Sequence, residues 1–270
     1  MPPEPVRIEL RGAIAVVVFD DPERRNAMTE AMGRALTKGV ARLAADPAIR
    51  AVVLTGEGVA FSAGGDLAMI EGKSRAGRAE PGQAARGRNR AFMRDFYRLF
   101  LSVRELPCPS IAAIQGAAIG AGLAVALACD LRIAAREARL GLNFAKLGIH
   151  PGMGSSWTLP RLVGPAHAAE LLFSGRSVDG VEAERIGLVN RAVPRDAVLA
   201  TALGLAEEIA ACAPIAVRGS KRALARAYDV ALDEQLDFEA EQQAICYESA
   251  DLAEGLRATR EKRPPRFEAC

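Results

Sequence analysis

Two glycine-rich segments are the parts of this sequence that could do chemistry through the main chain. One is Phe61-Ser-Ala-Gly-Gly-Asp-Leu67 and the other is Gly116-Ala-Ala-Ile-Gly-Ala-Gly122. Each follows an apolar stretch typical of a strand and precedes a helix start. The first N–H groups of a helix lack intrahelical partners and carry partial positive charge. Small side chains allow a ligand to approach that backbone closely.

Two such turns on neighbouring strands could direct two N–H donors at one carbonyl oxygen. That arrangement is an oxyanion hole, in which each donor can contribute about 2.7–4 kcal/mol of transition-state stabilisation. The alternative is that the glycines serve only tight turns and close packing of helix on strand. For one segment alone that structural interpretation is the better one, whereas the two segments together favour a site.

Other common sites find little support in the sequence. Gly72-Lys73-Ser74 imitates the end of a phosphate-binding loop, but Leu67 stands where the first glycine of that motif is required. The motifs GxSxG, HExxH and GxGxxG are absent from the sequence. His150 and His167 are the only two histidines, which argues against a histidine-based metal site, and we expect no metal.

The composition is that of an ordinary globular protein. Of the 270 residues, 50% are apolar and 25% are charged. A net charge of +2 is too small to indicate nucleic acid or an anionic membrane as a partner. No apolar run reaches the roughly 20 residues of a membrane span, and the first residues do not resemble a signal peptide. The cysteines lie at 108, 129, 212, 246 and 270 without a CxxC, which indicates reduced thiols and a cytoplasmic location.

Strand and helix patterns predict an α/β body followed by a helical region. The predicted body contains a hairpin at 6–20, a helix capped by Thr29 and ended before Pro47, and buried strands at 51–54, 110–114 and 131–134. Residues 71–90, rich in glycine and arginine, are expected to form a mobile loop, and a helix follows it. Four helices are predicted at 198–211, 215–228, 232–247 and 251–262. We therefore divide the chain into an α/β core at 1–195 and a helical C-terminal region at 196–270.

The order of these motifs resembles the crotonase superfamily, the family of enoyl-CoA hydratases and isomerases. Besides the two glycine-rich segments, the resemblance rests on Pro22–Met28, on Gly148-Ile-His-Pro-Gly-Met-Gly154 with Leu159–Gly164, on Ala183–Val189, and on Glu254-Gly-Leu-Arg with Glu261-Lys-Arg263. It covers roughly residues 6–267. Each motif is modest alone, and their shared order makes the resemblance strong.

The resemblance implies a fold, an activity and a partner. The fold would be a spiral of ββα units with a C-terminal helical trimerisation region. The ligand would be an acyl-CoA thioester, with no cofactor beyond the coenzyme A of the substrate itself. The protein would be a lyase or isomerase of fatty acid metabolism that polarises the thioester carbonyl and stabilises an enolate. It would self-associate to a homotrimer or a dimer of trimers, although the helical region could also cap only its own subunit.

Motif matching also implies the site residues. The oxyanion-hole donors would be the main-chain N–H groups of Gly65 and Ala121, and His150 is the best-placed side chain for proton transfer. The residues expected to bind substrate or coenzyme A are Arg25, Ala27, Ala63, Asp66, Leu67, Gly120, Ala124, Phe144 and Lys262. By their positions, Asp130 is interpreted as structural and Asp66 as a loop or cap residue.

The sequence departs from the family where hydratases carry two glutamates. One position is Ala124, four residues after Gly120, and the other is Phe144, four residues before Gly148. Some isomerases carry an acid at the position of Gly152. Since acid–base catalysis contributes about 10²–10⁴-fold, ordinary hydration is doubtful.

Three alternatives remain open from the sequence. An oxyanion hole can stabilise an enolate formed by loss of CO₂ from a malonyl-type thioester, which needs no base. A non-catalytic acyl-CoA binding protein is the second alternative. In the third, an acid from elsewhere replaces the glutamates, the candidates being His150, Glu71, Asp95, Tyr97 and Ser155. The pocket is expected to be apolar, from Met69, Phe144, Met153 and Trp157, and the arginines of 71–90 could form a lid that contacts CoA phosphates.

Overall fold

The computed structural model describes residues 4–268, and its body is built on a six-stranded sheet with the strand order β1-β2-β3-β5-β7-β10. The strands are β1 Val6–Arg11, β2 Ile14–Phe19, β3 Ala51–Gly56, β5 Ser110–Ile114, β7 Leu131–Ala135 and β10 Arg191–Val193. As predicted, β1 and β2 form an antiparallel hairpin, with Val6 opposite Phe19. The other pairs are parallel. Every residue of β2, β3 and β5 is buried, which explains why these strands appear in the sequence as continuous apolar runs.

A second, smaller sheet has the order β4-β6-β8-β9. Its strands are β4 Ala60–Ser62, β6 Ala117–Ile119, β8 Leu140–Gly141 and β9 Ser177–Val178. Along the chain, one strand of the large sheet is followed by one strand of the small sheet and then by a helix, as in β3-β4-α2 and β5-β6-α4. This repeated unit is the predicted spiral of ββα units.

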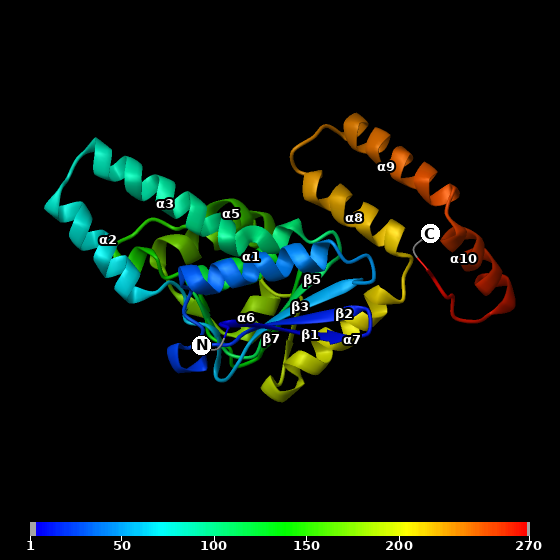
Figure 1. Cartoon of the computed structure of the whole chain (residues 1–270), viewed down its shortest axis with the longest axis horizontal. Coiled ribbons are helices and arrows are strands. Elements are labelled where there is room, and N and C mark those ends of the chain that lie inside the picture. Colours follow the sequence, from blue (N-terminus) through cyan, green and yellow to red (C-terminus); the bar gives the residue numbers. More distant parts are fainter. Residues whose placement is uncertain (1–3, 269–270) are drawn as a thin grey trace.

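Helices cover the sheets and hold the hairpin in place. The helices of the body are α1 Glu30–Ala44, α4 Ala121–Ala128, α5 Ser155–Ser174, α6 Gly180–Arg185 and α7 Val198–Ala210. As predicted, Thr29 caps α1, its hydroxyl accepting from Met32 N at 3.2 Å. Helix α7 packs on β3, β5 and β7 of the large sheet, whereas α1 packs on α3, which crosses above it (Figure 1).

The expectation of a mobile loop at 71–90 is wrong. The segment folds into α2 Leu67–Ala79 and the first half of α3 Gln83–Leu101, and this helical hairpin projects from one end of the molecule (Figure 1). Each glycine inside a helix costs only about 1 kcal/mol relative to alanine, and packing outweighs that cost here. Phe96 and Phe100 bury one face of α3, and Lys73 on α2 lies 3.5 Å from the ring centroid of Phe92 on α3.

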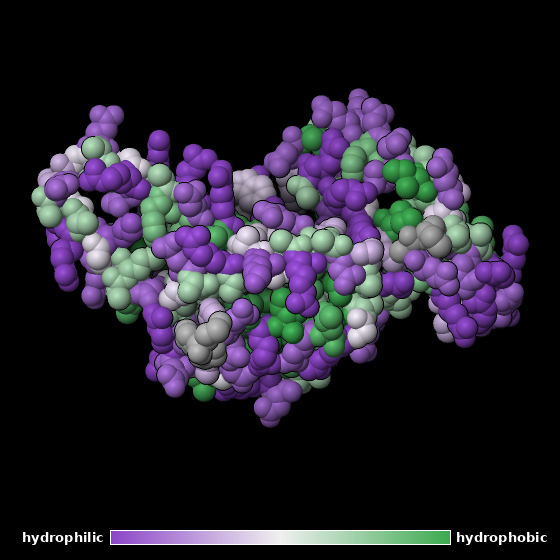
Figure 2. Space-filling model, in the orientation of Figure 1, coloured by the Kyte–Doolittle hydropathy of each residue, from purple (hydrophilic) through white to green (hydrophobic). Residues whose placement is uncertain are grey.

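The segment 196–270, divided off in the sequence analysis, is helical in its described part. Its first helix, α7, packs on the large sheet with the body, whereas α8 Pro214–Arg226, α9 Leu232–Tyr247 and α10 Ala250–Glu261 lie at the end of the molecule opposite the α2–α3 hairpin (Figure 1). Arg50 donates to Ala210 O at 3.1 Å and to Phe267 O at 2.5 Å, which attaches both ends of the α8–α10 segment to the body. Figure 2 shows hydrophobic surface within this region, and no residue of α9 is buried.

Among residues 4–268, no single helix is both long and apolar enough to cross a membrane. The helix pair Arg195–Ala210 and Pro214–Arg226 satisfies the length and composition criteria only when its two helices, bent by 111°, are taken together.

Candidate active site

The topology of the small sheet brings the two glycine-rich segments together. Strands β4 and β6 are parallel neighbours, with Ala60 opposite Ala117 and Ser62 opposite Ala118. Their carboxyl ends therefore meet at one edge of the sheet. From that edge β4 leads through Ala63–Asp66 into α2, and β6 leads through Gly120 into α4.

Gly65 and Ala121 each present a main-chain N–H that the fold does not use. Met28 N donates to Gly64 O at 2.8 Å and Asp66 N donates to Met28 O at 3.3 Å. Because extended residues alternate in direction, the N–H of Gly65 between them faces away from Met28. Ala121 is the first residue of α4, where an N–H has no intrahelical partner. Within the described residues, neither N–H has a hydrogen-bond partner.

Two glycines set the distance between these donors. Gly64 has φ +98°, and a Cβ there would lie 2.6 Å from Ile119 O and 3.7 Å from Ala121 N. The Gly64–Gly65 peptide is therefore in close contact with the start of α4. A Cβ at Gly122 would lie 2.7 Å from Ser62 O, so α4 packs on β4 at a distance that only glycine allows.

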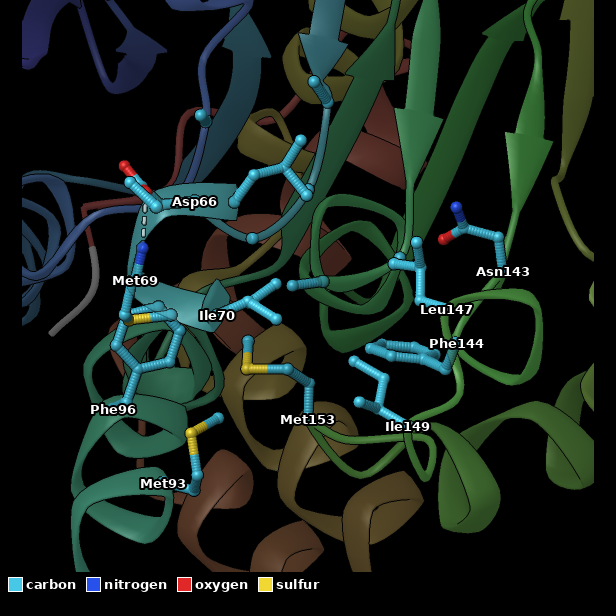
Figure 3. A pocket seen from close by; sticks show the side chains of 18 of the residues that line it. Asp66, Met69, Ile70, Met93, Phe96, Asn143, Phe144, Leu147, Ile149 and Met153 are labelled. Carbon is cyan, nitrogen blue, oxygen red and sulfur yellow. Dashed lines mark hydrogen bonds between the residues drawn. The ribbon is translucent and has the colours of Figure 1, made fainter. Parts of the chain in front are cut away.

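Both residues with free N–H groups line one cavity of about 560 Å³. The opposing walls are apolar, as expected for Met69, Phe144 and Met153. Figure 3 shows Met69 and Ile70 of α2 and Met93 and Phe96 of α3 facing the segment that carries Phe144, Leu147, Ile149 and Met153. Trp157 lies outside this lining, 41% exposed, with its ring centroid 3.8 Å from the guanidinium carbon of Arg161. Two donors in an apolar cavity are suited to bind a single carbonyl oxygen, because low polarity strengthens each hydrogen bond.

Asp66 is the cap of α2, as its position indicated. Its Oδ1 accepts from Met69 N at 2.9 Å, and its Oδ2 accepts from Arg24 (Figure 3 draws the first contact). The carboxylate is therefore engaged by a helix N-terminus and a guanidinium.

In the early turn, the cavity is lined by Arg24 and not by Arg25, whose role in binding coenzyme A stays a prediction. Arg24 lines the cavity, whereas Arg25, which motif matching favoured, is exposed in a left-handed conformation with φ +51°. The carbonyl of Arg25 instead accepts from Ala63 N at 2.8 Å and fixes the turn before α2. Asn143 also lines the cavity, next to Gly120, and the sequence analysis missed it.

The remaining predicted binding residues divide between cavity and scaffold. Ala27, Ala63, Leu67, Gly120 and Phe144 line the cavity. Ala124 is buried one turn into α4, outside the described lining, and its N–H donates to Gly120 O at 3.1 Å. Lys262 is the C-cap of α10, in the helical region at the opposite end of the molecule, where no described cavity residue lies (Figure 1).

Of the five candidate replacement acids, the structure places two in the cavity. His150 lines it and is exposed, with Nδ1 2.8 Å from Pro151 O. Tyr97 lines it and is half-buried, and this burial raises the pKa of its phenol. The others lie outside the described lining: Glu71 and Asp95 are exposed, and Ser155 is buried with Oγ donating to Gly152 O at 2.7 Å.

Asp130 has the structural role that its position suggested. Its Oδ2 accepts from Ser110 N at 2.7 Å, from Ser110 Oγ at 2.8 Å and from Lys221 Nζ at 2.7 Å. The carboxylate thus joins the start of β5 to helix α8. Across residues 4–268, no group of three or more His, Cys, Asp or Glu side chains is placed to hold a metal ion.

Comparison with known proteins shows which family has a sequence similar to this chain. A Thermus thermophilus protein, assigned by its name to the enoyl-CoA hydratases, is 42% identical over 262 residues, which are 97% of this chain and 100% of that protein. The mitochondrial methylglutaconyl-CoA hydratase of Mus musculus is 36% identical over 96% of this chain and 80% of its own length. The family model for enoyl-CoA hydratase/isomerase matches residues 9–269. The chain belongs to the enoyl-CoA hydratase/isomerase family.

Solved structures of this family have the same fold. The crystal structure of an enoyl-CoA hydratase from Bacillus anthracis superposes with a TM-score of 0.88 at 34% identity, covering 98% of this chain and 100% of that one. The resemblance to the crotonase superfamily and the predicted α/β spiral of ββα units are therefore confirmed for this enoyl-CoA hydratase/isomerase family member, whereas trimerisation through the helical region stays a prediction. The roles of its individual residues stay predictions.

Proposed function

We propose that the cavity binds an acyl-CoA thioester whose carbonyl oxygen accepts hydrogen bonds from Gly65 N and Ala121 N. The observation that carries this proposal is a pair of N–H groups at the adjoining ends of β4 and β6 that have no partner within residues 4–268 and lie in one apolar cavity. As the carbonyl becomes an enolate, negative charge grows on the oxygen, and both hydrogen bonds strengthen.

The reaction that fits this cavity is decarboxylation of a malonyl-type thioester. The bond between the α-carbon and the carboxylate breaks, its electron pair forms the enolate, CO₂ leaves, and a proton then adds to the α-carbon. No base is required. Apolar walls also favour neutral CO₂ over the carboxylate, because burying a charge without a partner is costly. Ordinary hydration needs proton carriers, and Ala124 and Phe144 cannot serve as such.

The second candidate function is acyl-CoA binding without turnover. Asp66 is the carboxylate in the described cavity lining, and it caps α2 and pairs with Arg24. Because these contacts occupy it, it is poorly suited to transfer protons, which supports binding without turnover. The two candidates differ in whether the bound thioester changes.

Two measurements test these proposals. A panel of saturated, enoyl- and malonyl-type acyl-CoAs is incubated with the protein and followed by mass spectrometry; we expect loss of CO₂ from a malonyl-type member. No change in any member would refute catalysis and leave the binding function.

The second measurement tests the two donors directly. Calorimetry compares butyryl-CoA with S-butyl-CoA, a thioether that lacks only the carbonyl oxygen. We expect the thioester to bind more tightly. Equal affinity for the two ligands would refute the donor assignment whether or not the protein is catalytic.

We also propose that the helical region, taken as residues 196–270, mediates self-association to a trimer or a dimer of trimers. Helix α9 buries none of its residues in the chain, and it exposes Leu232, Leu236, Ile245 and Tyr247. Exposed apolar residues of this density are typical of association surfaces. Light scattering after gel filtration gives the mass, and a mass of about 28.5 kDa, that of one chain, would refute this proposal.

A further inference from the structure

The cavity wall contains a contact between Tyr97 of α3 and Gly152 of the segment before α5. A Cβ at Gly152 would lie 2.5 Å from the Tyr97 hydroxyl oxygen and 2.8 Å from the ring carbon that carries it. The phenol therefore occupies the space that any side chain at position 152 would take. Met153, next to Gly152, and Phe96, next to Tyr97, both line the cavity, so this contact belongs to its wall.

Tyr97 differs from the other titratable groups in the described cavity lining, because its polar atom forms no hydrogen bond or ion pair within residues 4–268. Arg24 and Asp66 pair with each other, and His150 is exposed with Nδ1 against Pro151 O. The Tyr97 hydroxyl has no hydrogen-bond partner among the residues that the structure describes. The fold therefore does not use this O–H, which is free to donate to a bound ligand.

We infer that Tyr97 donates the proton that the α-carbon of the thioester enolate takes up. This inference rests on the proposed enolate chemistry. In the step, the O–H bond of Tyr97 breaks and a C–H bond forms at the α-carbon, while the enolate electron pair becomes that bond and the carbonyl is restored. The tyrosinate left behind takes a proton from water, so no other reactant is consumed.

The properties of the phenol suit this role. Burial raises its pKa, so the proton is present at neutral pH. An enolate carbon of a thioester is a much stronger base than a phenolate, so the transfer is downhill. Tyr97 is only half-buried, so water can approach its side chain for the return of the proton. Gly152 and Ser155 supply no acidic side chain at this wall. Tyr97 would therefore protonate the enolate on the face that is turned toward α3.

The test is Tyr97→Phe, with Tyr228→Phe as the matched control. Tyr228 is 74% exposed and lies outside the cavity, so its variant loses the same atom without touching the site. The substrate is methylmalonyl-CoA, or another α-substituted malonyl-type thioester that the panel identifies, in D₂O, because only an α-substituent makes the deuterated carbon a stereocentre. We expect kcat of Tyr97→Phe to fall by about 10²–10⁴-fold, the usual contribution of a general acid, with little change in KM.

The stereochemistry of deuterium uptake distinguishes a proton donor from a residue that only packs. The wild type and Tyr228→Phe should give one enantiomer of the α-deuterated product, whereas Tyr97→Phe should give a mixture. A Tyr97→Phe variant with the wild-type kcat and the same single enantiomer would overturn the inference while the proposed function stands. Thioester binding without turnover by the wild type would instead overturn the proposed reaction, and the role of Tyr97 with it.

Discussion

Replacing Ala121 by proline should remove one proposed oxyanion donor and put the ring Cδ in place of the N–H hydrogen, while the helix start is kept. Proline lacks the N–H, and its fixed φ suits the first position of a helix. Ala121 occupies that position in α4, where the N–H has no intrahelical partner. The expected change in thermal stability is therefore small.

The expected loss is catalytic. Removing one donor of this kind costs about 2.7–4 kcal/mol, or 10²–10³ in kcat. Gly65→Pro should give a loss of the same order, because the two N–H groups act on the same oxygen. Their effects should not add fully, since one remaining donor holds the oxygen less firmly and in a looser geometry.

The assay is kcat on the malonyl-type thioester found in the panel, with the calorimetric difference between butyryl-CoA and S-butyl-CoA as a second measurement. Ala121→Gly and Gly65→Ala are the matched controls, because both keep the N–H. A Cβ at Gly65 would meet only the flexible end of Ile70, at 3.3 Å from Cδ1. Folded proline variants with the kcat and the thioester preference of their controls would refute the two-donor reasoning.

Three further outcomes are expected. Crotonyl-CoA hydration by the wild type should be near background, because Ala124 and Phe144 cannot carry protons; rapid loss of the enoyl absorbance would contradict this. Gly64→Ala should destabilise the fold by about 1–3 kcal/mol in urea unfolding, since alanine is strained at φ +98° and its Cβ would press on a carbonyl; unchanged stability would mean that the turn can relax. The hydrogen bond from Arg263, chiefly, holds the pKa of Glu254 below its ordinary value, so its stabilisation of the chain end is present at neutral pH and is lost as pH falls through the acidic range. The protection factors of the amides in 263–268, which are exchange rates corrected for the pH dependence of intrinsic exchange, should therefore fall in acid in the wild type, and in Glu254→Gln they should be low at every pH. Wild-type protection factors that do not change with pH would contradict this.

The longer strands of the large sheet, α1 and the four C-terminal helices could be predicted from the sequence because their signals are local and long enough. Helix α2 and the start of α3 could not, because their glycines and arginines obscure the helical pattern. Continuous apolar runs marked β2, β3 and β5, and helical periodicity marked α9 to the residue. The strands of the small sheet have only two or three residues each, which is too short for any alternation to show. The structure is needed to see that two of them lie side by side.

The site was predicted in part for the same reason. Glycine-rich turns are a local signal that marked the two segments, and matching to the family's motifs then selected Gly65 and Ala121, which line one cavity in the structure. The choice between Arg24 and Arg25 depends on the direction of a single turn residue with positive φ, which the spacing does not encode. The contact of Tyr97 with Gly152 joins segments far apart in the chain, and only the packing of α3 against the cavity brings them together.

Arg50 gives the C-terminal helices a common anchor. One guanidinium binds the carbonyl of Ala210, where the chain leaves the body, and that of Phe267, where it returns. If the chain separates from the body at Ala210 or at Phe267, Arg50 loses one of its two carbonyl acceptors. The guanidinium is then less fixed, and its hydrogen bond to the other carbonyl weakens. We therefore expect α8, α9 and α10 to detach from the body in one cooperative event, as a single foldon, and not to fray progressively from the chain end.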